Sequence, residues 1–190
     1  MVSVIELWLP ILVGAVIVFF GSAIIWMATP LHTPDIKPAP EGLEKAVAEL
    51  KMERGHYLFP MGGNGPKDMK DRAFMERFDR GPWGSITISG KPNFGLNLAR
   101  TFAVYLVTLV FVAYVTGQAL GPGAAYFDVF RVAGAAAVLG FTFGGLPNDV
   151  FFAKPTRFVI SGIIEAAILA TLAAGAFAGL WPEGAPIPTP

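Results

Sequence analysis

The chain has 190 residues, of which 54% are hydrophobic and only 15% are charged, and its 14 basic residues balance its 14 acidic ones. A soluble domain carries roughly a quarter charged residues, so this composition favours an integral membrane protein whose main partner is the lipid bilayer. The balanced charge gives no reason to expect nucleic-acid binding, and the absence of cysteine excludes disulfides, thiolate metal sites and cysteine nucleophiles.

The first apolar stretch runs from about Val4 to Ala28, which is long enough to cross the hydrocarbon core of a bilayer. No Lys or Arg precedes it, and Glu6 occupies the place where a signal peptide has its basic residues. We therefore expect residues 1–28 to form a retained first transmembrane helix.

A long polar loop follows over residues 29–98. Its proline-rich start, up to Pro40, should be extended. The spacing of apolar residues predicts two short amphipathic helices, over Glu41–Glu53 and Pro66–Asp79. Elements of this size cannot build a core of their own, so we expect them to lie on the membrane face or against a partner.

Two further segments of the loop, His56–Met61 and Ser85–Ser89, have strand-like patterns and could form a small hairpin. The glycine-rich run over residues 62–65 lacks the Lys-Ser/Thr pair and the preceding buried strand of a phosphate-binding loop. We interpret it as a turn.

Three more apolar stretches lie within residues 99–181, at about Thr101–Ala119, Phe127–Leu146 and Phe158–Trp181. Short connections with helix-breaking residues separate them, with Pro147 between the last two stretches, so these helices should be antiparallel neighbours. A Pro-rich tail, residues 182–190, follows. The predicted fold is an all-α membrane protein, a bundle of four transmembrane helices whose cytoplasmic loop carries two short amphipathic helices and a possible small hairpin.

The basic residues indicate the orientation of the bundle. Eleven of the 14 lie between Lys37 and Arg100, and Lys154 and Arg157 lie in the last connection. The positive-inside rule places both regions in the cytoplasm and both termini on the periplasmic or external side.

Glu165 is the most informative single residue, because it lies about eight residues inside the fourth apolar stretch. A charged carboxylate at such a depth costs at least ~2.5–3.5 kcal/mol on insertion scales, so it must be paired, protonated or next to water. One interpretation is a proton-titrating or ion-coordinating group in a transport path. The other is a structural pair, or a neutral acid bonded to a neighbouring helix.

Asp128 and Arg131 lie three residues apart near the outer end of the third span. This spacing predicts a local ion pair on one helix face. An alternative is that Arg131 reaches inward and neutralises Glu165.

Small residues recur every four positions in the third and fourth spans. Such stripes let helix backbones approach closely in lipid. They indicate tight packing inside one bundle or, alternatively, an oligomer interface. The candidate packing residues are Ala136, Gly140 and Gly144 in the third span, and Gly162, Ala166 and Ala170 in the fourth.

The chain shows no motif typical of a catalytic, cofactor or metal site. His32 and His56 both belong to the polar loop, where a lone histidine is usually solvated or interfacial. Trp26 lies near the end of the first span and fits an interfacial aromatic belt. We expect a protein that is no enzyme and has no cofactor.

The first span ends in Gly21-Ser22-Ala23-Ile24-Ile25-Trp26 before a proline-bearing exit. Leu139-Gly140 through Asn148-Asp149 and Phe152-Ala153-Lys154-Pro155 lead to a last helix that ends in Gly179-Leu180-Trp181. In these segments, about half of the chain, the protein resembles the uncharacterised small four-helix membrane proteins of bacteria. The resemblance implies the same topology in a bacterial inner membrane and implies no mechanism.

Two hypotheses about function follow. The first is a non-catalytic accessory or scaffolding subunit of a membrane complex, with homo- or hetero-oligomeric membrane partners. The second is a small oligomeric transporter or channel that uses Glu165.

Overall fold

The computed structural model describes residues 1–62 and 65–184. The chain forms two compact units. Met1–Lys37 and Gly95–Pro190 make up the first, called the helical unit here, and Pro38–Phe94 make up the second, called the loop unit.

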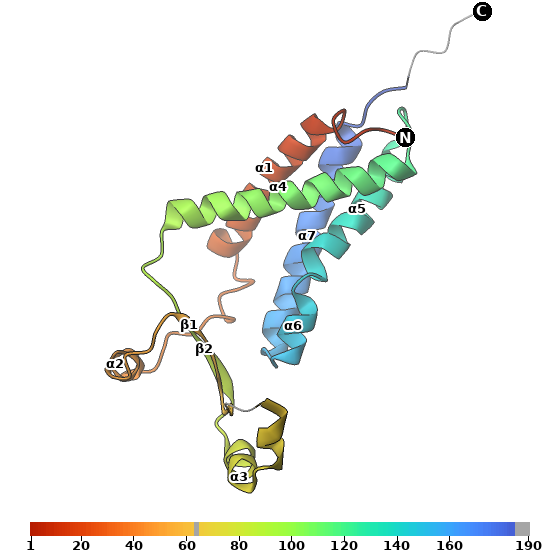
Figure 1. Ribbon diagram of the computed structural model, residues 1–190. Helices are drawn as coiled ribbons and strands as arrows, with labels where there is room; N and C mark the ends of the chain where they lie inside the picture. The colour runs from red at the N-terminus through yellow and green to blue at the C-terminus, as the bar shows by residue number, and fades with distance from the viewer. Residues whose placement is uncertain (63–64, 185–190) are drawn as a thin grey trace, which may run out of the picture. The chain divides into compact units, whose positions relative to one another are not determined.

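The described chain is mostly helical and has four helical stretches that are long and apolar enough to cross a membrane, as predicted. The helices of the first unit, shown in Figure 1, are α1 (Trp8–Ala28), α4 (Phe94–Ala119), α5 (Tyr126–Thr142), the short α6 (Leu146–Phe151) and α7 (Thr156–Gly179).

The third apolar stretch is divided in two. It covers Tyr126–Phe151, but α5 ends at Thr142 and α6 begins at Leu146. The expectation that Pro147 separates the last two spans is wrong, because this proline lies in the first turn of α6. Proline is accepted there since the first backbone N–H groups of a helix have no intrahelical partner.

The core of the helical unit forms where α7 packs along α5 and α1 (Figure 1). The side chain of Phe177 in α7 is fully buried among small residues such as Ala133 and Ala173. Helix α4 crosses the others obliquely and contributes Leu109, which lies so close to α1 that a Cβ at Gly14 would be 2.9 Å from its side chain. Small residues therefore set the distances between these helices.

The buried stripe of α5 consists of Val129, Ala133 and Ala137, not of the predicted Ala136, Gly140 and Gly144. Ala136 is only half-buried and Gly140 is exposed. Since successive residues lie about 100° apart around a helix, the predicted stripe is rotated away from the face that packs on α7.

The predicted positions have different surroundings. A Cβ at Gly140 would be 2.9 Å from Thr108 of α4, and Gly144 lies beyond the end of α5. In α7, Ala166 and Ala170 are buried, whereas Gly162 is exposed with nothing within 4 Å of an added Cβ.

The N-terminus, the α4–α5 turn and the end of α7 meet at one end of the helical unit. The backbone N–H of Val2 donates to the carbonyl of Gly117 at 2.8 Å. The indole of Trp181 donates to the carbonyl of Gly121 at 2.9 Å. Both ends of the unit therefore lie on one side, as an even number of spans requires. The tail residues 185–190 fall outside the described residues.

Ser3 and Glu6 form reciprocal hydrogen bonds at the turn that precedes α1. The Ser3 backbone and hydroxyl donate to the Glu6 carboxylate at 2.8 and 2.6 Å, and the Glu6 N–H donates to the Ser3 hydroxyl at 3.3 Å. The Ser3 hydroxyl bond lowers the pKa of the Glu6 carboxyl. Glu6 therefore stabilises the turn before the first helix.

The loop unit contains short elements only. It comprises α2 (Leu43–Glu49), β1 (Gly55–Phe59), the 3₁₀ helix η1 (Gly65–Lys70), α3 (Arg72–Arg80) and β2 (Gly84–Ile88). Strands β1 and β2 form an antiparallel hairpin sheet in which Tyr57 is opposite Ile86.

The single helix predicted over Pro66–Asp79 is divided at Asp71. The carboxylate of Asp71 accepts the N–H of Ala73 at 2.9 Å and so caps α3, while η1 ends one residue earlier. Of the turn predicted over residues 62–65, positions 63 and 64 lie outside the described residues. No hydrophobic side chain described between residues 38 and 94 is buried.

Candidate functional site

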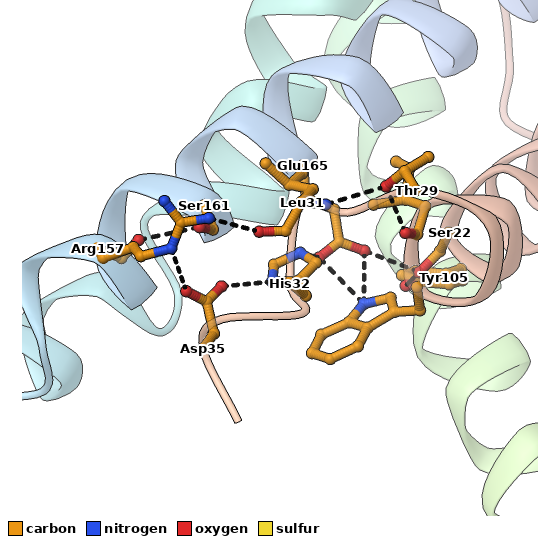
Figure 2. Close-up of polar contacts among 11 residues, drawn as sticks. Ser22, Thr29, Leu31, His32, Asp35, Tyr105, Arg157, Ser161 and Glu165 are labelled. Atoms are coloured by element: carbon orange, nitrogen blue, oxygen red, sulfur yellow. Dashed lines mark hydrogen bonds and ion pairs between the residues drawn. The ribbon is translucent and has the colours of Figure 1, made fainter. Parts of the chain in front are cut away.

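Glu165 is the tenth residue of α7, and its side chain is only 14% exposed. The Ser22 hydroxyl donates to Oε1 at 2.9 Å, and the Trp26 indole N–H lies 3.1 and 3.2 Å from the two oxygens. Nε2 of His32 lies 3.0 Å from Oε2 (Figure 2). A carboxylate has about four acceptor positions, so these contacts use its capacity almost fully.

Helix α1 supplies two of these partners from one face. Ser22 and Trp26 are four residues apart, which places both side chains on the side of α1 that packs along α7. The Tyr105 hydroxyl of α4 donates to the Ser22 hydroxyl at 3.0 Å and extends the network to a third helix.

The chain turns back towards α7 directly after α1. Pro30 cannot continue the helix, and the Thr29 hydroxyl bonds the carbonyl of Ile25 at 2.6 Å. The Thr29 hydroxyl also accepts the N–H of Leu31 at 3.4 Å. This local turn brings the next residue, His32, beside Glu165.

His32 is buried, so the expectation of a solvated or interfacial side chain is wrong. The residue is 5% exposed, and its ring stacks on the indole of Trp26 with centroids 4.1 Å apart and planes 5° apart. Its Nδ1 lies 2.9 Å from Oδ2 of Asp35. The imidazole therefore lies between two carboxylates, with one ring nitrogen facing each.

Asp35 connects the histidine to the first turn of α7. Its Oδ1 lies 3.3 Å from Nε of Arg157, and its side chain has no exposed surface. Arg157 also donates from Nη2 to the carbonyl of Leu31 at 3.4 Å. The result is an alternating row of acid and base, Glu165, His32, Asp35 and Arg157, which we call the charge chain (Figure 2).

Each of the two histidine contacts needs a proton. A neutral imidazole has one N–H and one lone pair, and a lone pair facing a carboxylate is repelled. The geometry is therefore satisfied by an imidazolium between two carboxylates, or by a neutral imidazole with one carboxyl group protonated. In both states the charge chain has no net charge, which lowers the cost of burying it.

Two pockets lie beside the residues of the charge chain. The first, of about 200 Å³, is at Glu165. The second, of about 390 Å³, is at Asp35 and Arg157. The first is lined by Trp26, Tyr105, Phe141, Gly162, Glu165, Ala166 and Leu169. The second is lined by Pro34, Asp35, Lys37, Pro155, Arg157 and Phe158.

Arg131 does not contact Glu165 in the structure. Its Nη1 lies 3.7 Å from Oδ1 of Asp128, and its side chain is 76% exposed. The two residues lie at different depths in the helical unit. Arg131 lies early in α5, near the end of the unit that holds the N-terminus, while Glu165 lies in the half of α7 that is farther from that end. The pairing of Asp128 with Arg131 is the local one expected of residues three apart.

Sequence reasoning missed most partners of Glu165. The i, i+4 spacing of Ser22 and Trp26 shows that they share one face of α1. Nothing in the sequence shows which residues of α7 this face contacts. His32 and Asp35 were hidden because their placement depends on the turn at Pro30. Arg157 was considered only as a basic residue that indicates the orientation of the bundle.

Among residues 1–62 and 65–184, no group of three or more His, Cys, Asp or Glu side chains is arranged to hold a metal ion. No family model, curated protein or solved structure matches the chain. Its function must therefore be inferred from its own geometry.

Proposed function

We propose that the protein is a non-catalytic integral membrane protein that serves as an accessory or scaffolding subunit of a membrane complex. The observation that supports this proposal is the loop unit, in which no described hydrophobic side chain is buried. Large apolar side chains are exposed instead, from 36% for Phe78 to 77% for Phe94. Apolar surface of this kind is typically covered by another surface.

A protein partner fits this surface better than an anionic bilayer. Residues 38–94 contain nine basic and eight acidic residues, so they present no excess of positive charge. Binding to anionic lipid usually depends on clusters of Lys and Arg. On α3, Phe74 and Phe78 contact each other, while Arg72 pairs with Glu76 beside them. An apolar patch with charges of both signs around it is typical of a protein interface.

The proposed location is the bacterial inner membrane, with the loop unit in the cytoplasm and both termini outside. The distribution of Lys and Arg supports this orientation. The N-terminus and the end of α7 lie at the same end of the helical unit, which is compatible with it.

Purification of the full chain from its native membrane tests the scaffolding proposal. We expect stoichiometric partner proteins to co-purify, and the double variant Met69→Ser and Phe78→Ser to lose them. The matched control, Lys45→Ser and Glu49→Ser, changes two exposed polar residues of the same unit and should keep the partners. Recovery of the chain with lipid alone, in wild type and variants, would contradict the proposal.

A second candidate is a small oligomeric transporter or channel that uses Glu165. The pocket of about 200 Å³ beside its carboxylate supports this alternative. In reconstituted vesicles it predicts a pH-dependent flux that Glu165→Gln abolishes and Asp128→Asn leaves intact, because Asp128 belongs to an exposed pair. The absence of any flux from the wild-type protein would remove this candidate.

A further inference from the structure

We propose that Glu165, His32 and Asp35 form a proton relay between the two pockets of the helical unit. The relay goes beyond the scaffolding role and deepens the second candidate, since it rests on exchange of a proton at Glu165. Its ligand is the proton itself, delivered by water or by an acidic group of a molecule in the first pocket.

The geometry of the histidine is the basis of this inference. Nε2 lies 3.0 Å from Oε2 of Glu165, and Nδ1 lies 2.9 Å from Oδ2 of Asp35. The Nδ1 contact is a hydrogen bond, along which protons move, and the Nε2 contact is an ion-pair contact of similar length. An imidazole can accept a proton at one nitrogen while it releases one from the other, which makes it suited to a shuttle.

The transfer step balances without any other reactant. The O–H bond on Oε2 of Glu165 breaks as an N–H bond forms at Nε2 of His32. The N–H bond at Nδ1 breaks as an O–H bond forms at Oδ2 of Asp35. Asp35 then gives the proton to water in the second pocket, which it lines, and the same steps in reverse return a proton to Glu165 and restore the starting imidazole tautomer. No electron is transferred to or from any group.

Burial keeps the transfer on this route. His32 is 5% exposed, and the Asp35 side chain has no exposed surface. The groups around the ring are the Trp26 indole, which stacks on it, the two carboxylates, and Arg157, which faces the far side of Asp35. The stacked indole keeps the ring in the plane that joins the two acids.

The two ends of the relay open to different places. Glu165 lines the first pocket, whose walls are mainly apolar and aromatic. Asp35 lines the second pocket together with Lys37 and Arg157. On the other side of Glu165 the core is apolar, with Val18, Leu109 and Phe177 buried. The relay therefore carries protons between the first and second pockets only. It does not continue through the core to the other end of the helical unit.

The rate at which Glu165 gains and loses its proton tests the relay. In the full chain reconstituted in vesicles, the carboxyl band of Glu165 is assigned in infrared spectra by its loss in Glu165→Gln, and its response to a rapid pH step is followed. We expect His32→Gln and Asp35→Asn each to slow this response by about tenfold or more, because a positioned proton-transfer group is lost. Arg131→Gln is the control and should keep the wild-type rate.

The relay also predicts chemical rescue. In His32→Gly, added imidazole should restore part of the rate, which a purely structural role of the ring would not produce. An unchanged rate in both His32→Gln and Asp35→Asn, or a slow His32→Gly that imidazole does not accelerate, would overturn the relay. A relay that passes these tests while the vesicles show no flux would remove only the transporter candidate. A Glu165 band that never responds to pH would remove both.

Discussion

The helical unit and the loop unit meet the same requirement, the removal of apolar surface from water, in different ways. Every hydrophobic side chain that is buried among the described residues belongs to the helical unit, and the members of its charge chain contact one another. The loop unit depends on local devices, such as the β1–β2 pairing and the Asp71 cap, and its apolar side chains point outward. The first unit has a core of its own, while for the second we propose a partner that covers its exposed apolar side chains.

The largest expected difference between the units comes from removing one aromatic ring from each. Phe177 is fully buried in α7, so Phe177→Ala should lower the free energy of unfolding by about 3–5 kcal/mol. Phe78 of α3 is partly exposed, and Phe78→Ala should cost less than about 1 kcal/mol. Unfolding of both variants in mixed micelles measures the contrast. Equal losses would show that the loop unit has a core of its own.

The next largest expected effect is the coupling free energy between two members of the charge chain. A double-mutant cycle of His32→Ala and Glu165→Ala should give a coupling of about 1–3 kcal/mol, because the pair is buried and in contact. The same cycle on the exposed pair Asp128 and Arg131 should give less than about 1 kcal/mol. Stability in micelles is again the readout. A larger coupling in the exposed pair would contradict the assignment of Glu165 to His32.

Substitutions in the small-residue stripes should change the stability of the helical unit by a smaller amount. Gly140→Ala introduces a Cβ 2.9 Å from Thr108, so it should destabilise the helical unit by about 1 kcal/mol or more. Gly162→Ala meets nothing within 4 Å and should be neutral or stabilise α7 by up to about 1 kcal/mol. Chromatography of the same variants reports on assembly. If Gly162→Ala dissociates a complex, the exposed glycine belongs to an interface.

The smallest effect is expected in the loop unit. Asp71→Ala removes the side-chain cap of α3 and should cost about 1 kcal/mol in local stability. Hydrogen exchange should become faster in α3 and stay unchanged in α7. Faster exchange throughout α7 would show that the two units unfold together.

The sequence was sufficient for the four apolar helices because length and hydropathy dictate them directly. It was less informative where the outcome depends on how helices are rotated. The buried stripe of α5 lies at Ala133 and Ala137, one position away from a stripe of equally small residues. Composition cannot distinguish two faces that are both suited to close packing.

The candidate site shows the same limit. The depth of Glu165 indicated that it needs a partner, but its partners come from a turn after α1 and from a helix register that no local pattern specifies. His32 was expected to be solvated or interfacial, and in the structure it is 5% exposed. A histidine in a polar loop looks solvated until the fold places two carboxylates beside it.

Hydrogen exchange on the full chain, compared between purified protein in lipid nanodiscs and protein in its native membrane, tests the contrast between the units most directly. We predict that α1, α5 and α7 are protected in both preparations. We also predict that residues 38–94 exchange rapidly in nanodiscs and become protected in the native membrane, where the proposed partner covers them. Equal protection of residues 38–94 in both preparations would contradict the account.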